Sequence, residues 1–163
     1  MEQPDTLYSW CRVASLESIA LNYEEALEIY ARTFESCKRG LGEDHWYSIQ
    51  CAHGLLTALI SLKDSERALP LALKALKDKK QAYGESHAKT LRAMERLAKV
   101  YSIGGRVSEA APLLRLVIQI RKRRLGPKRP ETIRASWLLI NLGINLTNLE
   151  RLSCSRFFIR GID

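Results

Sequence analysis

Apolar residues recur three and four positions apart along most of the chain, and residues 90–125 give the clearest example. Over 90–102 this spacing is typical of an amphipathic helix. The apolar positions are Leu91, Met94, Leu97, Ala98 and Tyr101. Gly104-Gly105 predicts a break after it. A second apolar stripe predicts a helix from Val107 to about Leu125, which ends at Gly126-Pro127. The pattern therefore predicts a helical hairpin.

The same pattern returns every 42 residues. Gly42, Gly84 and Gly126 stand at this interval. A hydroxyl residue also recurs in the same register, at Thr6, Ser48, Thr90 and Thr132. A period between 20 and 50 residues is typical of stacked repeats, whose units bury their apolar faces against one another. We therefore predict an all-α stack of helix–turn–helix repeats in one domain, residues 1–163. The expected units are 6–47, 48–89, 90–131, a partial fourth at 132–150 and a degenerate tail at 151–163.

Prolines and charges mark the expected helix ends. Pro4 and Pro130 are predicted to open the first helix of their repeats. Pro70 and Pro112 are equivalent residues, and we expect them in the first turn of the second helices. The fourth repeat begins with an apolar helix at about 131–147. Cations gather near the ends of the second helices, where they favour the negative end of the helix dipole.

Composition narrows the class of protein. The 163 residues are 46% hydrophobic and 27% charged, which is typical of a globular chain. The sequence shows no signal-peptide pattern and no apolar run long enough for a confident membrane span, so we expect a soluble, cytoplasmic protein. Four cysteines lack paired spacing, and reduced, packed thiols are expected at Cys11, Cys37, Cys51 and Cys154. The net charge of +8 favours acidic partners without choosing among peptide, nucleic acid and membrane surface.

Candidate chemistry is sparse. His45 and His87 are equivalent residues one repeat apart, so a structural role at the repeat junction is expected of them. His53 and Cys51 are two residues apart, on different faces of a helix, so they do not form a metal site. Gly104-Gly105 lacks the Lys-Ser/Thr of a phosphate loop. The sequence predicts no enzyme, no cofactor and no metal.

The stretch from His87 to Gly126 resembles a tetratricopeptide repeat of the 42-residue kinesin light chain type. The matching positions are Thr90-Leu91, Leu97-Ala98, Tyr101, Gly105, Glu109-Ala110 and Leu125-Gly126. Residues 121–132 are also similar to the inter-repeat segments of fungal repeat arrays, and the resemblance covers residues 3 to about 150. The sequence departs from the family where an Asn is usual, at Arg12, Gly54, Arg96 and Leu138. The resemblance implies a right-handed superhelix that acts as a protein–protein interaction adaptor.

In this family the first helix of each pair lines a concave groove. By that resemblance, the candidate peptide-binding residues are Arg12, Gln50, His53, Arg92, Arg96, Lys99, Arg134, Trp137 and Asn141. Arg92, Arg96 and Lys99 follow one another at helical spacing on one face, and guanidinium groups there would chelate a carboxylate. An acidic peptide is the expected ligand. The alternative is a solvated face in which these cations pair with Glu95.

Two other functions stay open. The run 121–124 with Lys128 and Arg129 is a basic cluster that would suit a nucleic-acid-associated protein, although no aromatic residues are interleaved with it. The chain would also suit a fragment of a larger sensor or signalling repeat array. Finally, the apolar helix at 131–147 predicts either a tail that caps it or self-association through the C-terminal repeat.

Overall fold

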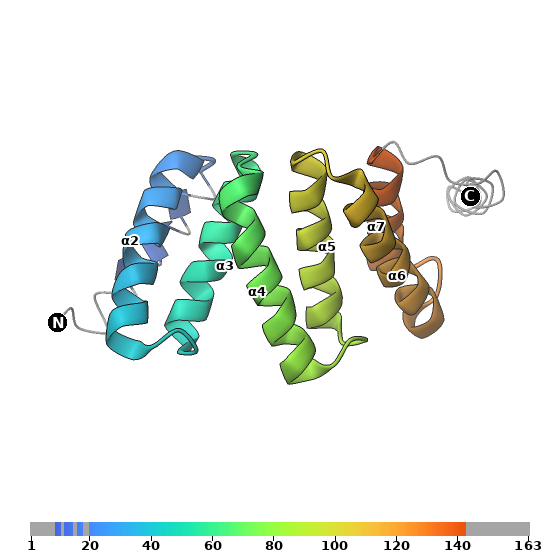
Figure 1. Ribbon diagram of the computed structural model, residues 1–163, viewed down its shortest axis with the longest axis horizontal. Helices are drawn as coiled ribbons and strands as arrows, with labels where there is room; N and C mark the ends of the chain where they lie inside the picture. The colour runs from blue at the N-terminus through green and yellow to red at the C-terminus, as the bar shows by residue number, and fades with distance from the viewer. Residues whose placement is uncertain (1–8, 11, 15, 18–19, 143–163) are drawn as a thin grey trace. The chain divides into compact units, whose positions relative to one another are not determined.

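The structure is a computed structural model that describes residues 9–10, 12–14, 16–17 and 20–142. The described residues before position 18 are helical, and further helices follow. They are α2 (Tyr23–Leu41), α3 (Trp46–Ser61), α4 (Ser65–Tyr83), α5 (Ala88–Ile103), α6 (Val107–Leu125) and α7 (Pro130–Asn141) (Figure 1). No strand occurs in the part of the chain that is described. The predicted all-α fold is confirmed.

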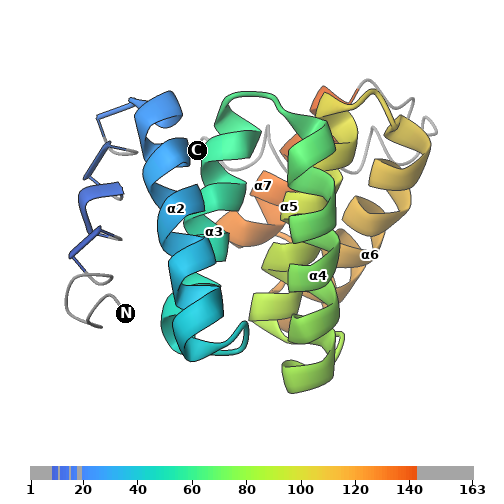
Figure 2. The same ribbon diagram turned by 60° about the vertical axis from the view of Figure 1, so that its left-hand side comes forward.

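The chain forms two compact units, Met1–Leu71 and Ala72–Asp163, and the boundary falls within α4. In unit 1, α2 packs against α3. In unit 2, α6 packs against both α5 and α7. Figures 1 and 2 show these neighbours side by side from two directions. Each unit is therefore built on antiparallel helical hairpins, as the hydrophobic pattern predicts.

A hydroxyl–carbonyl hydrogen bond recurs where one repeat meets the next. Ser48 Oγ donates to the Gly42 carbonyl at 2.6 Å, and Thr90 Oγ1 donates to the Gly84 carbonyl at 2.7 Å. Thr132 Oγ1 makes the same bond to Gly126 at 3.1 Å. All three hydroxyl residues are buried. This bond explains why Ser or Thr recurs in register with glycine.

The junction glycines have a backbone conformation that other residues avoid. Gly42 has φ 91° and ψ 161°, and Gly126 has φ 94° and ψ 161°. This region is essentially restricted to glycine. Open space surrounds the place where a Cβ would lie at either residue. The requirement for glycine is therefore conformational.

Two of the first helices begin with a histidine cap. His45 Nδ1 accepts a hydrogen bond from the Tyr47 N–H at 3.3 Å, and His87 Nδ1 accepts one from the Lys89 N–H at 3.2 Å. Each ring thus satisfies an N–H that has no partner within the helix. The predicted structural role of both histidines is confirmed. Helix α7 begins instead at Pro130, also as predicted.

The turns inside the hairpins share a left-handed residue. Leu21, Lys63 and Gly105 are 42 residues apart and have φ 67°, 59° and 70°. Only Gly105 takes this conformation without steric cost. In the second hairpin Asp64 supports the turn, because its Oδ1 accepts a hydrogen bond from the Arg67 N–H at 3.0 Å. The turn expected at residues 63–65 is therefore formed without glycine.

Small residues lie at the tightest contacts of the core. Four alanines of the core are buried, at Ala14, Ala68, Ala98 and Ala110. In unit 1, Gly54 lies directly against the ring of buried Tyr30, where a Cβ would overlap that ring. Glycine thus lets α2 and α3 approach closely. Cys37 and Cys51 form a neighbouring buried cluster and are not in a disulfide, whereas Cys11 and Cys154 lie outside the described residues.

Two predictions about helix ends need revision. Helices α4 and α6 begin at Ser65 and Val107, so Pro70 and Pro112 lie inside the helices and not in the first turn. Each removes one backbone hydrogen bond, because proline has no N–H. The helix predicted at 131–147 is described as far as Asn141, with Leu142 as its cap. Pro4, the tail and the remainder of that helix lie outside the described residues.

Candidate functional site

The nine predicted groove residues are divided between the units. Arg12, Gln50 and His53 belong to unit 1, where Arg12 and Gln50 are exposed and His53 is half-buried. The other six come from α5 and α7 of unit 2, and of these only Arg96 is half-buried while the rest are exposed. They are Arg92, Arg96, Lys99, Arg134, Trp137 and Asn141. The candidate site described below is the α5–α7 surface, meaning these six residues.

Helix α5 supplies three closely spaced cations. Arg92, Arg96 and Lys99 follow one another at intervals of four and three residues, which places them on one helix face. Partial burial lowers the pKa of Arg96 below its usual value, and the positive charge of Arg92 lowers it further. Among the residues that the structure describes, no acidic side chain pairs with these three cations. The cluster repels itself electrostatically and would favour an anion.

Glu95, which is the partner of these cations in the alternative interpretation, is bound by another residue. Its carboxylate is buried and accepts two hydrogen bonds from Arg121 of α6, at 2.6 and 3.0 Å. Only 4% of the Arg121 side chain and 7% of the Glu95 side chain are exposed. Glu95 therefore does not pair with Arg92 or Lys99, because its carboxylate points into the helix interface, while both cations remain exposed to solvent.

The role of Arg121 was missed by sequence reasoning, which took it as charge at a helix end. It also donates a hydrogen bond to the Glu131 carbonyl at 2.6 Å and so links α6 to the start of α7. A signal was present in the repeat. The equivalent residue two periods, or 84 positions, earlier is Cys37, which is apolar and buried. A cation at an interior position requires a buried partner.

Helix α7 brings a fourth cation to the same place. Arg134 Nη2 lies 3.6 Å from Glu95 Oε2, and 57% of the Arg134 side chain is exposed. This contact is long, and Glu95 already holds Arg121 in a closer bidentate pair. Arg134 therefore stands beside the α5 cations while keeping most of its surface in solvent. Trp137, one turn further along α7, is 43% exposed.

A small cavity of about 70 Å³ adjoins these residues. Lys99, Ser102 and Asn141 line it together with apolar side chains, among them Leu114 and Leu138. This volume holds a water molecule or two and is too small for a metabolite. The α5–α7 surface thus offers charge and an aromatic side chain to a ligand lying along it.

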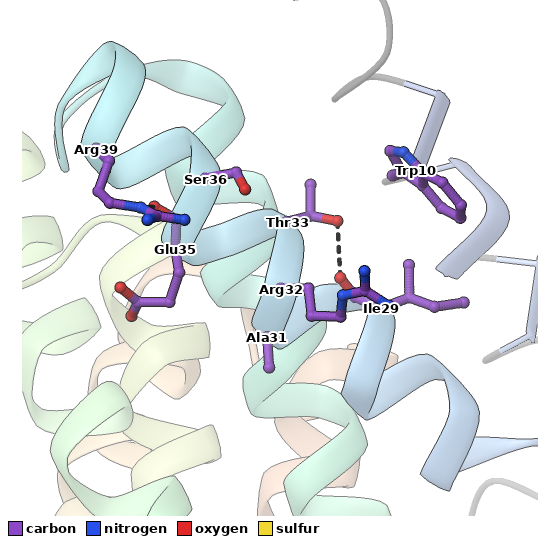
Figure 3. Close-up of a pocket in the computed structure, with 8 residues that line it drawn as sticks. All are labelled: Trp10, Ile29, Ala31, Arg32, Thr33, Glu35, Ser36 and Arg39. Carbon is purple, nitrogen blue, oxygen red and sulfur yellow. Dashed lines mark hydrogen bonds between the residues drawn. The ribbon is translucent and has the colours of Figure 1, made fainter. Parts of the chain in front are cut away.

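Unit 1 has a larger hollow of about 580 Å³ between Trp10 and α2 (Figure 3). Ile29 and Thr33 face Trp10 there, and the Thr33 hydroxyl donates to the Ile29 carbonyl at 2.7 Å. Arg39 donates to the Glu35 carbonyl at 3.3 Å. The polar groups of this hollow are thus partly used within α2, and none of the nine predicted residues lines it.

The described residues show no group of histidine, cysteine and carboxylate side chains that could hold a metal ion. Within the same residues, no helix is long and apolar enough to cross a membrane.

Comparison with known proteins identifies the family of this chain. Tetratricopeptide repeat models match residues 5–81 and residues 90–131. The chain belongs to the tetratricopeptide repeat family. The comparison with curated protein sequences gives no match.

Solved structures agree on the fold. A kinesin light chain-like protein with nearly identical repeats, from Podospora anserina, matches with a TM-score of 0.73 and 22% identity. The match covers 87% of this chain and 67% of that one. A tetratricopeptide-like protein from Chlorobium tepidum matches with a TM-score of 0.62 and 24% identity, over 85% of this chain and 94% of that one. At these identities the likeness shows the fold alone.

Proposed function

We propose that this protein is an adaptor that binds an acidic peptide segment on its α5–α7 surface. Tetratricopeptide repeats generally mediate protein–protein interaction and are typically non-enzymatic scaffolds. The proposal of an acidic ligand rests on the pairing of Glu95. Because this carboxylate is held by Arg121, the cations Arg92, Arg96 and Lys99 have no acidic partner among the described residues.

The charge of this surface supports an acidic ligand. A carboxylate placed between Arg92 and Arg96 would relieve the repulsion that lowers the pKa of Arg96. Guanidinium groups bind carboxylates through two parallel hydrogen bonds, which add geometric specificity to the charge. Exposed Trp137 would pack against an apolar residue of the same peptide. Shape and charge complementarity would therefore carry the interaction.

A charge-reversal experiment tests the proposal. The variant Arg92→Glu, Arg96→Glu, Lys99→Glu should bind a fluorescent oligoglutamate peptide at least 30-fold more weakly, about 2 kcal/mol. Fluorescence anisotropy at moderate salt measures the affinity. The matched control, Arg32→Glu, Lys77→Glu, Arg115→Glu, makes the same change in net charge at exposed residues outside the surface. Since Arg96 is half-buried, circular dichroism must confirm that the groove variant folds. Binding that survives the groove reversal would refute the proposal.

The finer aspects of this function are also proposals. A cytoplasmic location fits Cys37 and Cys51, which are buried and form no disulfide, because disulfides are rare in that compartment. Fractionation of cells that produce the tagged chain would test it.

The alternative role as part of a larger sensor or signalling array uses the same surface. Self-association through the C-terminal repeat is supported by exposed Trp137 and Ile140 on α7. We expect that deleting residues 151–163 promotes it, as light scattering across a concentration series would show.

A further inference from the structure

The junction between α6 and α7 differs in charge from the two equivalent junctions before it. At the first junction Lys38 pairs with Glu43 at 3.1 Å, and at the second Lys80 pairs with Glu85 at 2.9 Å. At the third junction the equivalents are Lys122 and Pro127, so the acidic partner is lost. Both earlier pairs are local ion pairs across a helix end. The third junction keeps the cation without the anion.

Further cations gather at this third junction. Arg123 and Arg124 end α6, while Lys128 and Arg129 occupy the loop before α7, and all four are exposed. Within the described part of the chain, no acidic side chain pairs with Lys122, Arg123, Lys128 or Arg129. Lys122, Arg123 and Arg124 lie in the last turn of α6, where cations favour the helix dipole, but Lys128 and Arg129 precede α7 and have no such explanation.

The neighbouring second junction carries an aromatic pair, an exposed tyrosine and a half-buried histidine. The rings of Tyr83 and His87 stack with centroids 4.8 Å apart and planes 18° apart. Lys89 Nζ lies 4.5 Å from the Tyr83 ring centroid and donates a hydrogen bond to its hydroxyl oxygen at 3.1 Å. This hydrogen bond and the charge of Lys89 lower the pKa of Tyr83. Tyr83 is 42% exposed, whereas the equivalent residues at the other junctions are leucines.

One hydrogen bond joins the two junctions. Arg124 Nη1 donates to the Ser86 carbonyl at 2.6 Å, between Tyr83 and Lys89 in the chain. Both junctions lie at the lower edge of unit 2 in Figure 1. The aromatic pair and the third-junction cations therefore form one surface. Sequence reasoning found no aromatic residue among these cations, because Tyr83 and Arg124 are 41 positions apart.

We propose that this surface binds single-stranded nucleic acid, with phosphates on Arg123, Lys128 and Arg129 and a base stacked at Tyr83 and His87. Proteins that bind single strands combine a basic track for the backbone with aromatic side chains for the bases. An acidic peptide would use the cations and leave the aromatic pair without a role. The proposal goes beyond peptide binding on the α5–α7 surface, and each can fail without the other.

The phosphate contacts are tested with a fluorescent 12-nucleotide oligouridine on the full chain, by anisotropy over a salt series. The junction variant Arg123→Glu, Lys128→Glu, Arg129→Glu should bind at least tenfold more weakly at low salt. The logarithm of its binding constant should also fall less steeply with the logarithm of the salt concentration, by about 2 in slope, because each phosphate contact on a single strand contributes about 0.7. The control is again Arg32→Glu, Lys77→Glu, Arg115→Glu, with the same change in net charge. Equal losses in both variants would overturn the proposal. Gln in place of Glu serves if the junction variant does not fold.

The base contact is tested separately at Tyr83. Tyr83→Ala should weaken oligouridine binding about tenfold, while Tyr83→Phe keeps the ring and should retain most of the affinity. Neither change should alter binding of oligoglutamate. If Tyr83→Ala binds oligouridine like the parent, or if a duplex of equal length binds as tightly, the single-strand assignment is wrong. If oligoglutamate competes for the junction with equal affinity, the surface is a peptide site.

Discussion

Removing the negative charge of Glu95 should destabilise unit 2 strongly. In Glu95→Gln, Arg121 stays buried and loses the carboxylate that accepts its hydrogen bonds at 2.6 and 3.0 Å. Its remaining acceptors are the Glu131 carbonyl and the one amide oxygen of the new side chain, and neither carries a charge. Leaving one member of a buried ion pair without the other costs about 3–5 kcal/mol. For a chain of this length that lowers Tm by roughly 6–20 °C.

The assay is thermal unfolding followed by circular dichroism, with amide hydrogen exchange to locate the loss in unit 2. Arg134→Gln is the matched control, because it removes a half-exposed cation that lies 3.6 Å from the same carboxylate. We expect a cost below about 1 kcal/mol for it. A second test replaces the pair with apolar residues. Glu95→Leu with Arg121→Met should be much more stable than either single variant, since no buried charge remains. A Glu95→Gln protein that melts within about 2 °C of the parent would refute this account.

Three further predictions concern glycine and alanine. Gly126→Ala should cost about 1–3 kcal/mol in thermal melts, because φ 94° with ψ 161° is restricted to glycine, whereas Gly40→Ala, inside α2 with open space around it, should not destabilise. Gly54→Ala should lower Tm despite its better helix propensity, because the new methyl group meets the Tyr30 ring; an unchanged Tm would mean that Tyr30 moves aside freely. Ala98→Phe and Ala110→Phe should each cost about 1–3 kcal/mol by overpacking buried positions, and parent-like melts of both would show that the assigned helix faces are wrong.

The repeat period made most of the local fold predictable. A 42-residue interval and a 3.6-residue apolar spacing depend only on side-chain identity, so α6 begins at Val107 and ends at Leu125 as expected. A structural role for His45 and His87 followed from their equivalence, whereas their capping hydrogen bonds became known only from the structure. The placement of Pro70 and Pro112 was wrong, since proline within a helix depends on where the preceding turn is capped.

The candidate site was less predictable because it depends on contacts between helices. The helical spacing of Arg92, Arg96 and Lys99 followed from the sequence, but the burial of Glu95 against Arg121 did not. Those two residues are 26 positions apart and share no local pattern. The same holds for Arg124 and the Ser86 carbonyl. Charged residues at helix ends give no local signal that separates solvated groups from buried ones.

The hydroxyl–glycine bond at each junction has a consequence for how such chains grow. The donor and the acceptor of each bond are six residues apart, so one short segment of the chain contains the whole interaction. The buried Glu95–Arg121 pair is likewise contained within residues 90–131. A duplicated 42-residue period would therefore contain its own hydroxyl–carbonyl hydrogen bond and its own buried ion pair. Tandem duplication or unequal recombination in register could lengthen this array without requiring compensating substitutions elsewhere.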